Sequence, residues 1–579
     1  MLNRLTFKQA GLYSLVAAVA SSVWLIKSFS SSPDAIDRDS YIVKSHDTAL
    51  LQQTMDTLGL TPSHKLDIIS AVAVDLTTYE REKIAKLGAF QITKNFSVEL
   101  SGGNAWGKRK WQPKAVVPSY IDADYAHMTR NFGDGVTIGF LDTGIDALQG
   151  TSSGLGLSTD LYGYDKFWGT YDAINNTISN YSNEESGHGT HVASVAVNAD
   201  YDVYGNIYGV APNAAAVGIK AFDSDGKATY ADVIRGIDWA IQVKDKINLR
   251  VLNMSFGGQQ RSYYWDDPLN QAVMKAWQEG IVVVASAGNN GPDPMTIGVP
   301  GNVPYIITVG AMTDNFTETN VQDDIIATFS AAGPTPAGFV KPELVAPGGH
   351  VSGLMAYDTQ IVMQHPEYHD GGKYFEMSGT SQAAAVVSGV AALMISQDPS
   401  LTPDEVKCRL IDSAHTAMTP EGKLAYSVFQ QGSGLVNAKD ALKSTASGCA
   451  NQSLDIQKDL AGEKHFYGPA NINEDGNFYV EGLGEEYVWR VNDSSLSGDA
   501  VIWRLNYDDN PMDWRNSAST DAVIWRLDFE TNAVIWRLNF ETDAVIWRLN
   551  LETDAVIWRL NLDDPEAAPI SINHWVDPQ

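Results

Sequence analysis

Between about Ser119 and Ala446, short apolar runs bounded by Gly or Pro alternate with segments of helical periodicity. The runs are rich in β-branched residues, as expected for strands that are buried on both faces. Segments 229–245 and 267–280 between them have the apolar spacing of helices. This alternation predicts an α/β domain with a mainly parallel sheet flanked by helices. The clearest strand runs are 136–142, 215–222, 249–256, 281–288 and 305–312.

The chain has 579 residues, too many for one hydrophobic core, so we expect several units. A small α+β unit precedes the α/β domain, and an exposed linker rich in Gly, Trp and Lys follows its closing strand. In this unit we expect strands at 41–44, 71–76 and 90–100 and helices at 50–60 and 77–88. The predicted division is 1–30, signal peptide or anchor; 31–115, α+β unit; 116–447, α/β domain; 448–579, C-terminal acidic domain.

The N-terminus predicts export. Arg4 and Lys8 precede the apolar run Ala10–Ile26, which is the arrangement of a secretory signal. This run has 17 residues, the lower limit for a membrane span, so an uncleaved anchor is the alternative. We expect a secreted, extracellular protein that meets a membrane only if this segment is uncleaved.

The charge of the chain is strongly acidic. It has 40 Lys and Arg against 70 Asp and Glu, a formal net charge of −30. Attraction to nucleic acid phosphates is therefore not expected. Residues 451–579 hold 24 acidic and 9 basic residues, about half of the excess, which marks this stretch as a separate unit.

An 11-residue repeat fills much of the C-terminal part, and its last four copies are nearly identical to AVIWRLNFETD. Val, Trp, Leu and Phe alternate with Ile, Arg, Asn and Glu, the period of a strand, and ETDA suits a turn. We predict a β-repeat module with its own apolar core. The alternative is a row of Trp and Arg that binds a surface or a polymer. The repeated tryptophans are Trp503, Trp514, Trp525, Trp536, Trp547 and Trp558.

Three motifs place a carboxylate, an imidazole and a hydroxyl at the ends of predicted elements. Asp142 ends a strand in GFLDTGID, His188 precedes a helix in SGHGTHVAS, and Ser381 begins an apolar helix in SGTSQAAA. A serine hydroxyl needs a base to accept its proton, and the base needs a carboxylate to stabilise its charged form. A helix N-terminus also favours the negative charge that develops on the substrate oxygen. Together the motifs predict nucleophilic catalysis, which none predicts singly.

These motifs resemble those of the subtilisin-like serine peptidases, and they occur in the same chain order as DTG, HGTHVA and GTSQA. The resemblance covers about 330 residues and implies a serine endopeptidase that acts on polypeptide substrates without a cofactor in its chemistry. It also implies that residues 31–115 are an inhibitory propeptide that is removed by self-processing.

The same resemblance assigns further site residues. Asn289 in SAGNN takes the position of the family's side-chain oxyanion donor. Ser255, Phe256 and Gly257 match the strand edge that pairs with an extended substrate. Ala287 and Gly288 match the side of the pocket for the residue before the cleaved bond. An apolar preference with broad specificity follows as an expectation.

The chain departs from the family pattern at Ala385, where proline is common, and at Ser194, where glycine is frequent. Neither position supplies chemistry, but both affect helix packing. The family often binds structural calcium, yet no ligand set maps onto residues 152–183, and the metal stays unknown.

The chain has two cysteines, Cys408 and Cys449, which either form a disulfide or remain unrelated buried thiols.

Two other functions are weighed against the peptidase. A noncatalytic surface protein would bind through the repeats and would be expected to lack one of the three catalytic residues. Asp142, His188 and Ser381 are all present. A related acid peptidase would have Glu in place of the histidine, and His188 stands in its full motif. We therefore predict neutral to alkaline activity, because the base must be unprotonated.

Overall fold

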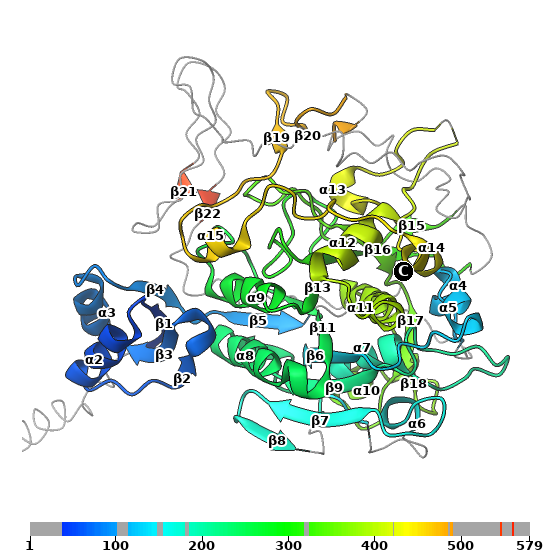
Figure 1. The fold of residues 1–579 in the computed structure, drawn as a ribbon, viewed down its shortest axis with the longest axis horizontal. Coiled ribbons are helices and arrows are strands. Elements are labelled where there is room, and N and C mark those ends of the chain that lie inside the picture. Colours follow the sequence, from blue (N-terminus) through cyan, green and yellow to red (C-terminus); the bar gives the residue numbers. More distant parts are fainter. Residues whose placement is uncertain are drawn as a thin grey trace, which may run out of the picture. The chain divides into compact units, whose positions relative to one another are not determined.

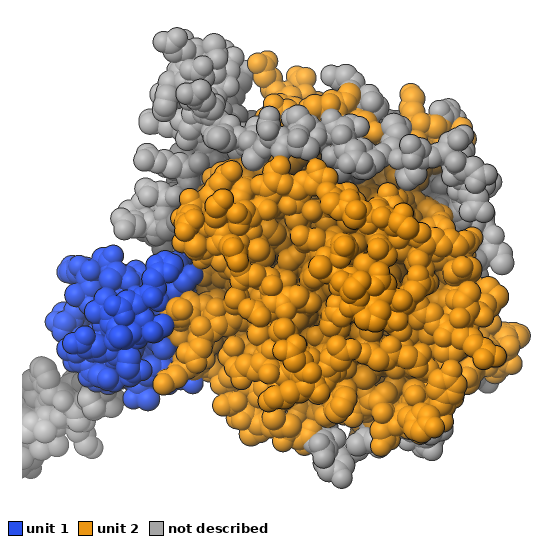
Figure 2. Space-filling model, in the orientation of Figure 1, with its two compact units in different colours: residues 1–63, 72–94 blue, residues 64–71, 95–579 orange. Residues whose placement is uncertain are grey.

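The computed structural model describes residues 38–100, 114–147, 155–179, 184–317, 323–420, 422–484 and 487–489, and two short strands at 545–546 and 559–560. Residues 38–63 and 72–94 belong to a smaller compact unit, and the other described residues belong to a larger one (Figure 2). The apolar run Ala10–Ile26 lies outside the described residues. Of the helices that are described, none combines the length and apolar character that a membrane span requires.

The smaller unit has its own hydrophobic core between two helices and three strands. β1 (Asp39–Lys44) lies between β3 (Ala71–Leu76) and β4 (Gln91–Lys94). Asp47 caps α2 (Thr48–Leu58), and a Thr77–Glu80 capping box begins α3 (Thr78–Ala85). The two helices and the strands predicted at 41–44 and 71–76 fall where the sequence predicts them. The core residues are Val43, Leu51, Met55, Leu60, Val72, Val74, Leu76 and Ile84.

A nine-stranded sheet forms the centre of the larger unit (Figure 1). Seven strands run parallel in the order β16-β14-β13-β11-β6-β9-β7, and the short strands β15 and β8 pair antiparallel at the edges. The predicted mainly parallel sheet is therefore observed. The strands are β6 (Thr137–Asp142), β7 (Phe167–Asp172), β8 (Thr177–Ser179), β9 (Ala215–Lys220), β11 (Leu249–Met254), β13 (Val282–Ser286), β14 (Ile307–Thr313), β15 (Ile325–Ile326) and β16 (Leu344–Pro347).

Helices cover both faces of this sheet. α8 (Tyr230–Ile247) and α9 (Pro268–Gln278) lie on one side of the central strands, and α7 (His188–Val197) and α11 (Thr380–Gln397) lie on the other (Figure 1). Every residue of α7 and residues 380–395 of α11 are buried. Both helices therefore lie in the core, and their polar side chains are buried with them. The smaller helices are α4 (Val117–Tyr120), α5 (Asp124–Met128), α6 (Leu155–Ser158), α10 (Gln360–Gln364), α12 (Pro403–Asp412), α13 (Val428–Gln431), α14 (Ala438–Lys443) and α15 (Ile456–Leu460).

The single closing strand predicted at 90–100 is divided in two, which corrects that expectation. β4 belongs to the smaller unit, and β5 (Ser97–Leu100) belongs to the larger one. Between them, Asn95 Oδ1 accepts a hydrogen bond from the backbone of Ala231, and Phe96 O accepts one from Tyr230. The two residues thus satisfy open N–H groups in the first turn of α8, where the chain has left the first sheet.

The segment after α11 packs on the core of the larger unit. A disulfide joins Cys408 of α12 to Cys449. The hairpin of β19 (Ala470–Ile472) and β20 (Phe478–Val480) contributes Phe478 to a core cluster that also contains Phe429 and Trp489. The sequence-based boundary at 447/448 therefore lies inside one packed region.

Little of the predicted repeat module is described. β21 (Val545–Ile546) pairs antiparallel with β22 (Arg559–Leu560). All six repeated tryptophans lie outside the described residues, so the module remains a prediction.

Candidate active site

Asp142 and His188 form a buried pair. Asp142 ends β6, His188 begins α7, and Nδ1 of the imidazole lies 2.7 Å from Oδ1 of the carboxylate. The two side chains are 0% and 1% exposed. Gly187 has a φ of 98°, and a Cβ there would lie 2.9 Å from Met355 and Thr359. Glycine is needed at this position for the chain to enter α7.

A second carboxylate, which the sequence analysis missed, borders this pair. Glu184 Oε1 accepts a hydrogen bond of 2.9 Å from Gly187 N, and Oε2 accepts one of 2.9 Å from Thr143 Oγ1. Thr143 directly follows Asp142, and its backbone N–H donates to Asp142 Oδ1 at 2.8 Å. Burial and the nearby charge of Asp142 raise the pKa of Glu184 to about 7. Its place four residues before His188 was the available signal.

Ser381 lies in the first turn of α11 and is fully buried. Its hydroxyl donates a hydrogen bond of 3.0 Å to the backbone oxygen of Ser255, and the Ser255 hydroxyl donates one of 2.9 Å to Ser381 O. These reciprocal bonds fix the start of α11 against the end of β11. The predicted nucleophile therefore adjoins the predicted substrate edge.

Asn289 contacts the start of α11 through Thr380. Its Oδ1 accepts hydrogen bonds from the Thr380 backbone at 3.0 Å and from the Thr380 hydroxyl at 2.8 Å. Its Nδ2 is buried and has no hydrogen-bond partner among the described residues. A buried amide donor without a partner is costly unless a ligand supplies the acceptor.

His191 joins α7 to α11 one turn beyond His188. Its Nδ1 lies 3.3 Å from Gln382 Nε2, and its Nε2 lies 3.1 Å from Phe375 O. Burial lowers the pKa of His191 to about 3, so this ring is neutral and structural. Ser194, a departure from the family pattern, accepts a hydrogen bond from Leu354 N at 2.7 Å. Ala385 is fully buried in α11.

The predicted substrate edge is occupied by the chain's own strand β5. β12 (Phe256–Gly257) pairs antiparallel with β5, placing Phe256 opposite Leu100 and Gly257 opposite Glu99. On its other side, β5 pairs with β10 (Lys227–Thr229). An extended segment therefore lies between two strands beside Ser255.

Ala287 and Gly288 follow β13 and adjoin the same region. Ala287 is 1% exposed and packs in a small apolar cluster with Ile297 and Ala331. The backbone N–H of Gly288 donates to Thr380 Oγ1 at 3.2 Å. Apolar groups thus line this position, next to the residue that precedes Ser381.

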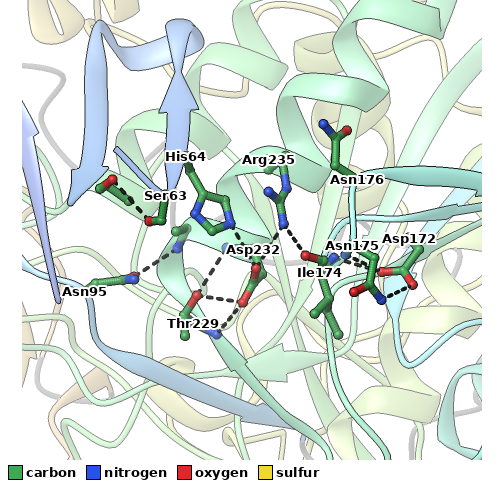
Figure 3. Close-up of polar contacts among 12 residues, drawn as sticks. Ser63, His64, Asn95, Asp172, Ile174, Asn175, Asn176, Thr229, Asp232 and Arg235 are labelled. Carbon is green, nitrogen blue, oxygen red and sulfur yellow. Dashed lines mark hydrogen bonds and ion pairs between the residues drawn. The ribbon is translucent and has the colours of Figure 1, made fainter. Parts of the chain in front are cut away.

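The first turn of α8 binds His64 and the residues directly before β5 (Figure 3). Thr229 and Asp232 form a capping box, and Asp232 Oδ1 lies 3.2 Å from both His64 Nε2 and Arg235 Nη2. Asn95 Oδ1 binds Ala231 N at 3.0 Å. These contacts place the chain directly before β5 at the edge of the site.

The described residues contain no group of three or more His, Cys, Asp or Glu side chains arranged to hold a metal ion. Structural calcium, which the family resemblance makes possible, stays an expectation, because calcium is also bound by backbone and amide oxygens.

Comparisons with known proteins show which family the chain is similar to. The model of the subtilase family matches residues 133–440. Serine protease AprX of Bacillus subtilis is 36% identical over 339 residues, which cover 57% of this chain and 72% of that protein. Subtilisin DY of Bacillus licheniformis is 34% identical over 323 residues, covering 55% of this chain and 96% of that protein.

A solved structure shares the fold. Fervidolysin from Fervidobacterium pennivorans, a keratinolytic enzyme related to subtilisin, aligns with a TM-score of 0.55 at 22% identity. The alignment covers 72% of this chain and 62% of that one. From the family model and these relatives, the chain belongs to the subtilase family and is a serine-type endopeptidase.

Proposed function

We propose that this endopeptidase is secreted and activates itself, with Asp142, His188 and Ser381 as its catalytic triad. The observation that carries the triad is the buried 2.7 Å hydrogen bond between His188 Nδ1 and Asp142 Oδ1. Such a bond fixes the tautomer of the imidazole and stabilises its protonated form. The helix that bears the imidazole packs on the helix that bears Ser381.

In the proposed reaction, the Ser381 hydroxyl turns from Ser255 O to His188 Nε2. The proton moves to that nitrogen while the serine oxygen attacks the carbonyl carbon of the scissile bond. Asn289 Nδ2 and the Ser381 backbone N–H donate to the resulting oxyanion. The C–N bond then breaks, and the imidazolium protonates the leaving amine. A water that loses a proton to His188 hydrolyses the acyl-enzyme.

The proposed substrates are extended polypeptides, recognised mainly through their backbone. The pairing of β5 with β12 supports this, because an added strand reads chain shape more than side chains. The buried methyl groups around Ala287 favour an apolar residue before the cleaved bond. We therefore propose broad specificity with an apolar preference.

Residues 31–115 are proposed to be an inhibitory propeptide. β5 occupies the edge assigned to substrate, which supports inhibition by occupation of the site. The antiparallel register places Leu100, the last described residue of β5, opposite Phe256. Phe256 directly follows Ser255, whose backbone oxygen lies 3.0 Å from Ser381 Oγ. Ser101 lies outside the described residues, and we propose that the first cut follows it, within the segment 31–115.

The test is expression of the full chain and of Ser381→Ala with an export signal, followed by intact mass and N-terminal sequencing. We expect the wild-type chain to begin at Gly102 after its first cut and to hydrolyse casein. The Ser381→Ala chain should keep residues 31–115 and show no hydrolysis. Equal processing of both chains would refute the triad, and a first cut elsewhere would refute the register.

Secretion and pH dependence belong to the same proposal. Arg4, Lys8 and the apolar run after them support export, and His188 must be neutral to accept a proton. Activity is therefore expected to rise from acid to neutral pH. Fractionation of a producing cell culture tests secretion, and recovery of the enzyme only with membranes would favour the anchor instead.

A further inference from the structure

Glu184 connects the two segments that carry the proposed acid and base. One carboxylate oxygen binds Gly187 N, directly before His188, and the other lies 3.3 Å from Thr190 N in the first turn of α7. That second oxygen also binds the hydroxyl of Thr143, the residue after Asp142. Thr143 Oγ1 in turn accepts a hydrogen bond from Gly189 N at 3.0 Å. One side chain thus joins the end of β6 to the start of α7.

Glu184 and Asp142 also lie close to each other. A Cβ at Gly189 would be 3.1 Å from Asp142 Oδ1 and 3.1 Å from Glu184 Oε2, and only 2.1 Å from Gly144 O. The two carboxylate oxygens are therefore at most about 6 Å apart, a distance at which charges in a protein interior interact strongly. Gly189 leaves the space that lets them approach.

We propose that Glu184 is a positioning residue for the base: it fixes the backbone on both sides of His188 and supplies negative charge that stabilises the His188 imidazolium. This inference rests on the proposed triad. The negative charge of Glu184 should change the pH dependence of catalysis. A carboxylate that only held the backbone would leave that pH dependence unchanged.

The charged groups around Glu184 define what its own charge can do. Asp142 on β6 repels it, and Lys220 on β9 attracts it. His188 and His191 belong to α7, whose first turn Glu184 contacts through Thr190 N, and His191 remains neutral. The raised pKa of Glu184, about 7, means that its negative charge develops in the range where His188 must lose its proton. The acid limb of the wild-type rate profile should therefore be broad.

The experiment measures kcat/KM against pH with a soluble peptide anilide for the processed wild type, Glu184→Gln and Glu185→Gln. Glu185 is the adjacent, exposed carboxylate and provides a matched change of charge. We expect Glu184→Gln to move the acid limb down by about half a pH unit, because a neutral neighbour stabilises imidazolium less. Glu185→Gln should leave it in place. The shift should persist in 1 M salt, which screens exposed charges.

Other results would overturn the inference. They are an unshifted Glu184→Gln profile, an equal loss at every pH without a shift, or an equal shift in both variants. Glu184→Ala, which also removes the acceptor of Gly187 N, should add a loss of activity at every pH. If that variant does not fold, the glutamine variant decides. Ser381→Ala is measured alongside to test the triad separately from the role of Glu184. If Ser381→Ala were active, the triad itself would be refuted.

Discussion

The starts of α7 and α11 carry the proposed base and nucleophile in opposite electrostatic surroundings. At the start of α7, the carboxylates of Asp142 and Glu184 bind His188, Gly187 and Thr190. At the start of α11, Thr380 binds the neutral amide of Asn289, and the Ser381 hydroxyl binds the neutral backbone oxygen of Ser255.

This difference follows the charges of the reaction. A proton moves from Ser381 to His188, so positive charge develops at the carboxylate-bound helix and negative charge at the amide-bound one. A carboxylate near the oxyanion would oppose the step, and an amide donor near the imidazolium would not help it. The two surroundings can therefore be tested separately.

The largest expected effect comes from neutralising the α7 side. Asp142→Asn keeps the shape of the side chain but presents a donor to His188, which favours the wrong imidazole tautomer. We expect kcat to fall about 10,000-fold at neutral pH, the loss known for this change in serine peptidases of another fold. Steady-state kinetics on the peptide anilide measure it. A loss below tenfold would mean that the carboxylate is not the partner of the base.

The next effect breaks the α11 side. Asn289→Ala removes the unpartnered Nδ2 donor, and kcat should fall about 100- to 1,000-fold with KM nearly unchanged; this range is the one established for subtilisin. Asn290→Ala, at the adjacent exposed residue, is the control and should retain activity. A rise in KM without a fall in kcat would indicate that Asn289 binds substrate rather than the oxyanion.

Thr380→Val tests how the amide is aimed. The Thr380 hydroxyl donates to Asn289 Oδ1 at 2.8 Å, which turns Nδ2 away from Thr380. Without that bond we expect kcat to fall about tenfold, in line with the loss of one buried hydrogen bond. Thr380→Ser keeps the hydroxyl and should restore most of the activity. Equal losses in both variants would point to packing instead.

The sequence predicted the parts of this site that are encoded locally. The apolar periodicity and the placement of glycines locate the ends of strands and helices. These ends are where the sequence has Asp142, His188 and Ser381. The parallel sheet was predicted for the same reason. Spacing in the sequence alone does not place Asn289 beside Thr380. The expectation that residues of separate motifs share one site came from the family resemblance.

Contacts between distant segments were not predictable. The division of the strand at 90–100 depends on open N–H groups in α8, more than a hundred residues away. Glu184 reads as one more acidic residue of a surface loop until Thr143 is placed beside it. The packing of Trp489 on Phe429 likewise arises only in the folded core.

The smallest effect sharpens the α7 side through stability. The pKa of Glu184 is raised in the folded state to about 7 from 4.5. Below pH 4.5, the Glu184 carboxyl is protonated in both the folded and the unfolded chain. As the pH rises to about 7, the unfolded chain loses this proton first, and the folded state therefore loses stability. Glu184→Gln removes this titration. Its melting temperature relative to the parent should therefore rise by about 2 to 4 °C between pH 4.5 and 7.5. Calorimetry in a Ser381→Ala background prevents self-digestion, and Glu185→Gln is the control. If the difference in melting temperature between Glu184→Gln and the parent does not change with pH, Glu184 carries the same charge in the folded and unfolded chains. The carboxylates at the start of α7 would then stabilise the imidazolium without lowering the stability of the folded protein.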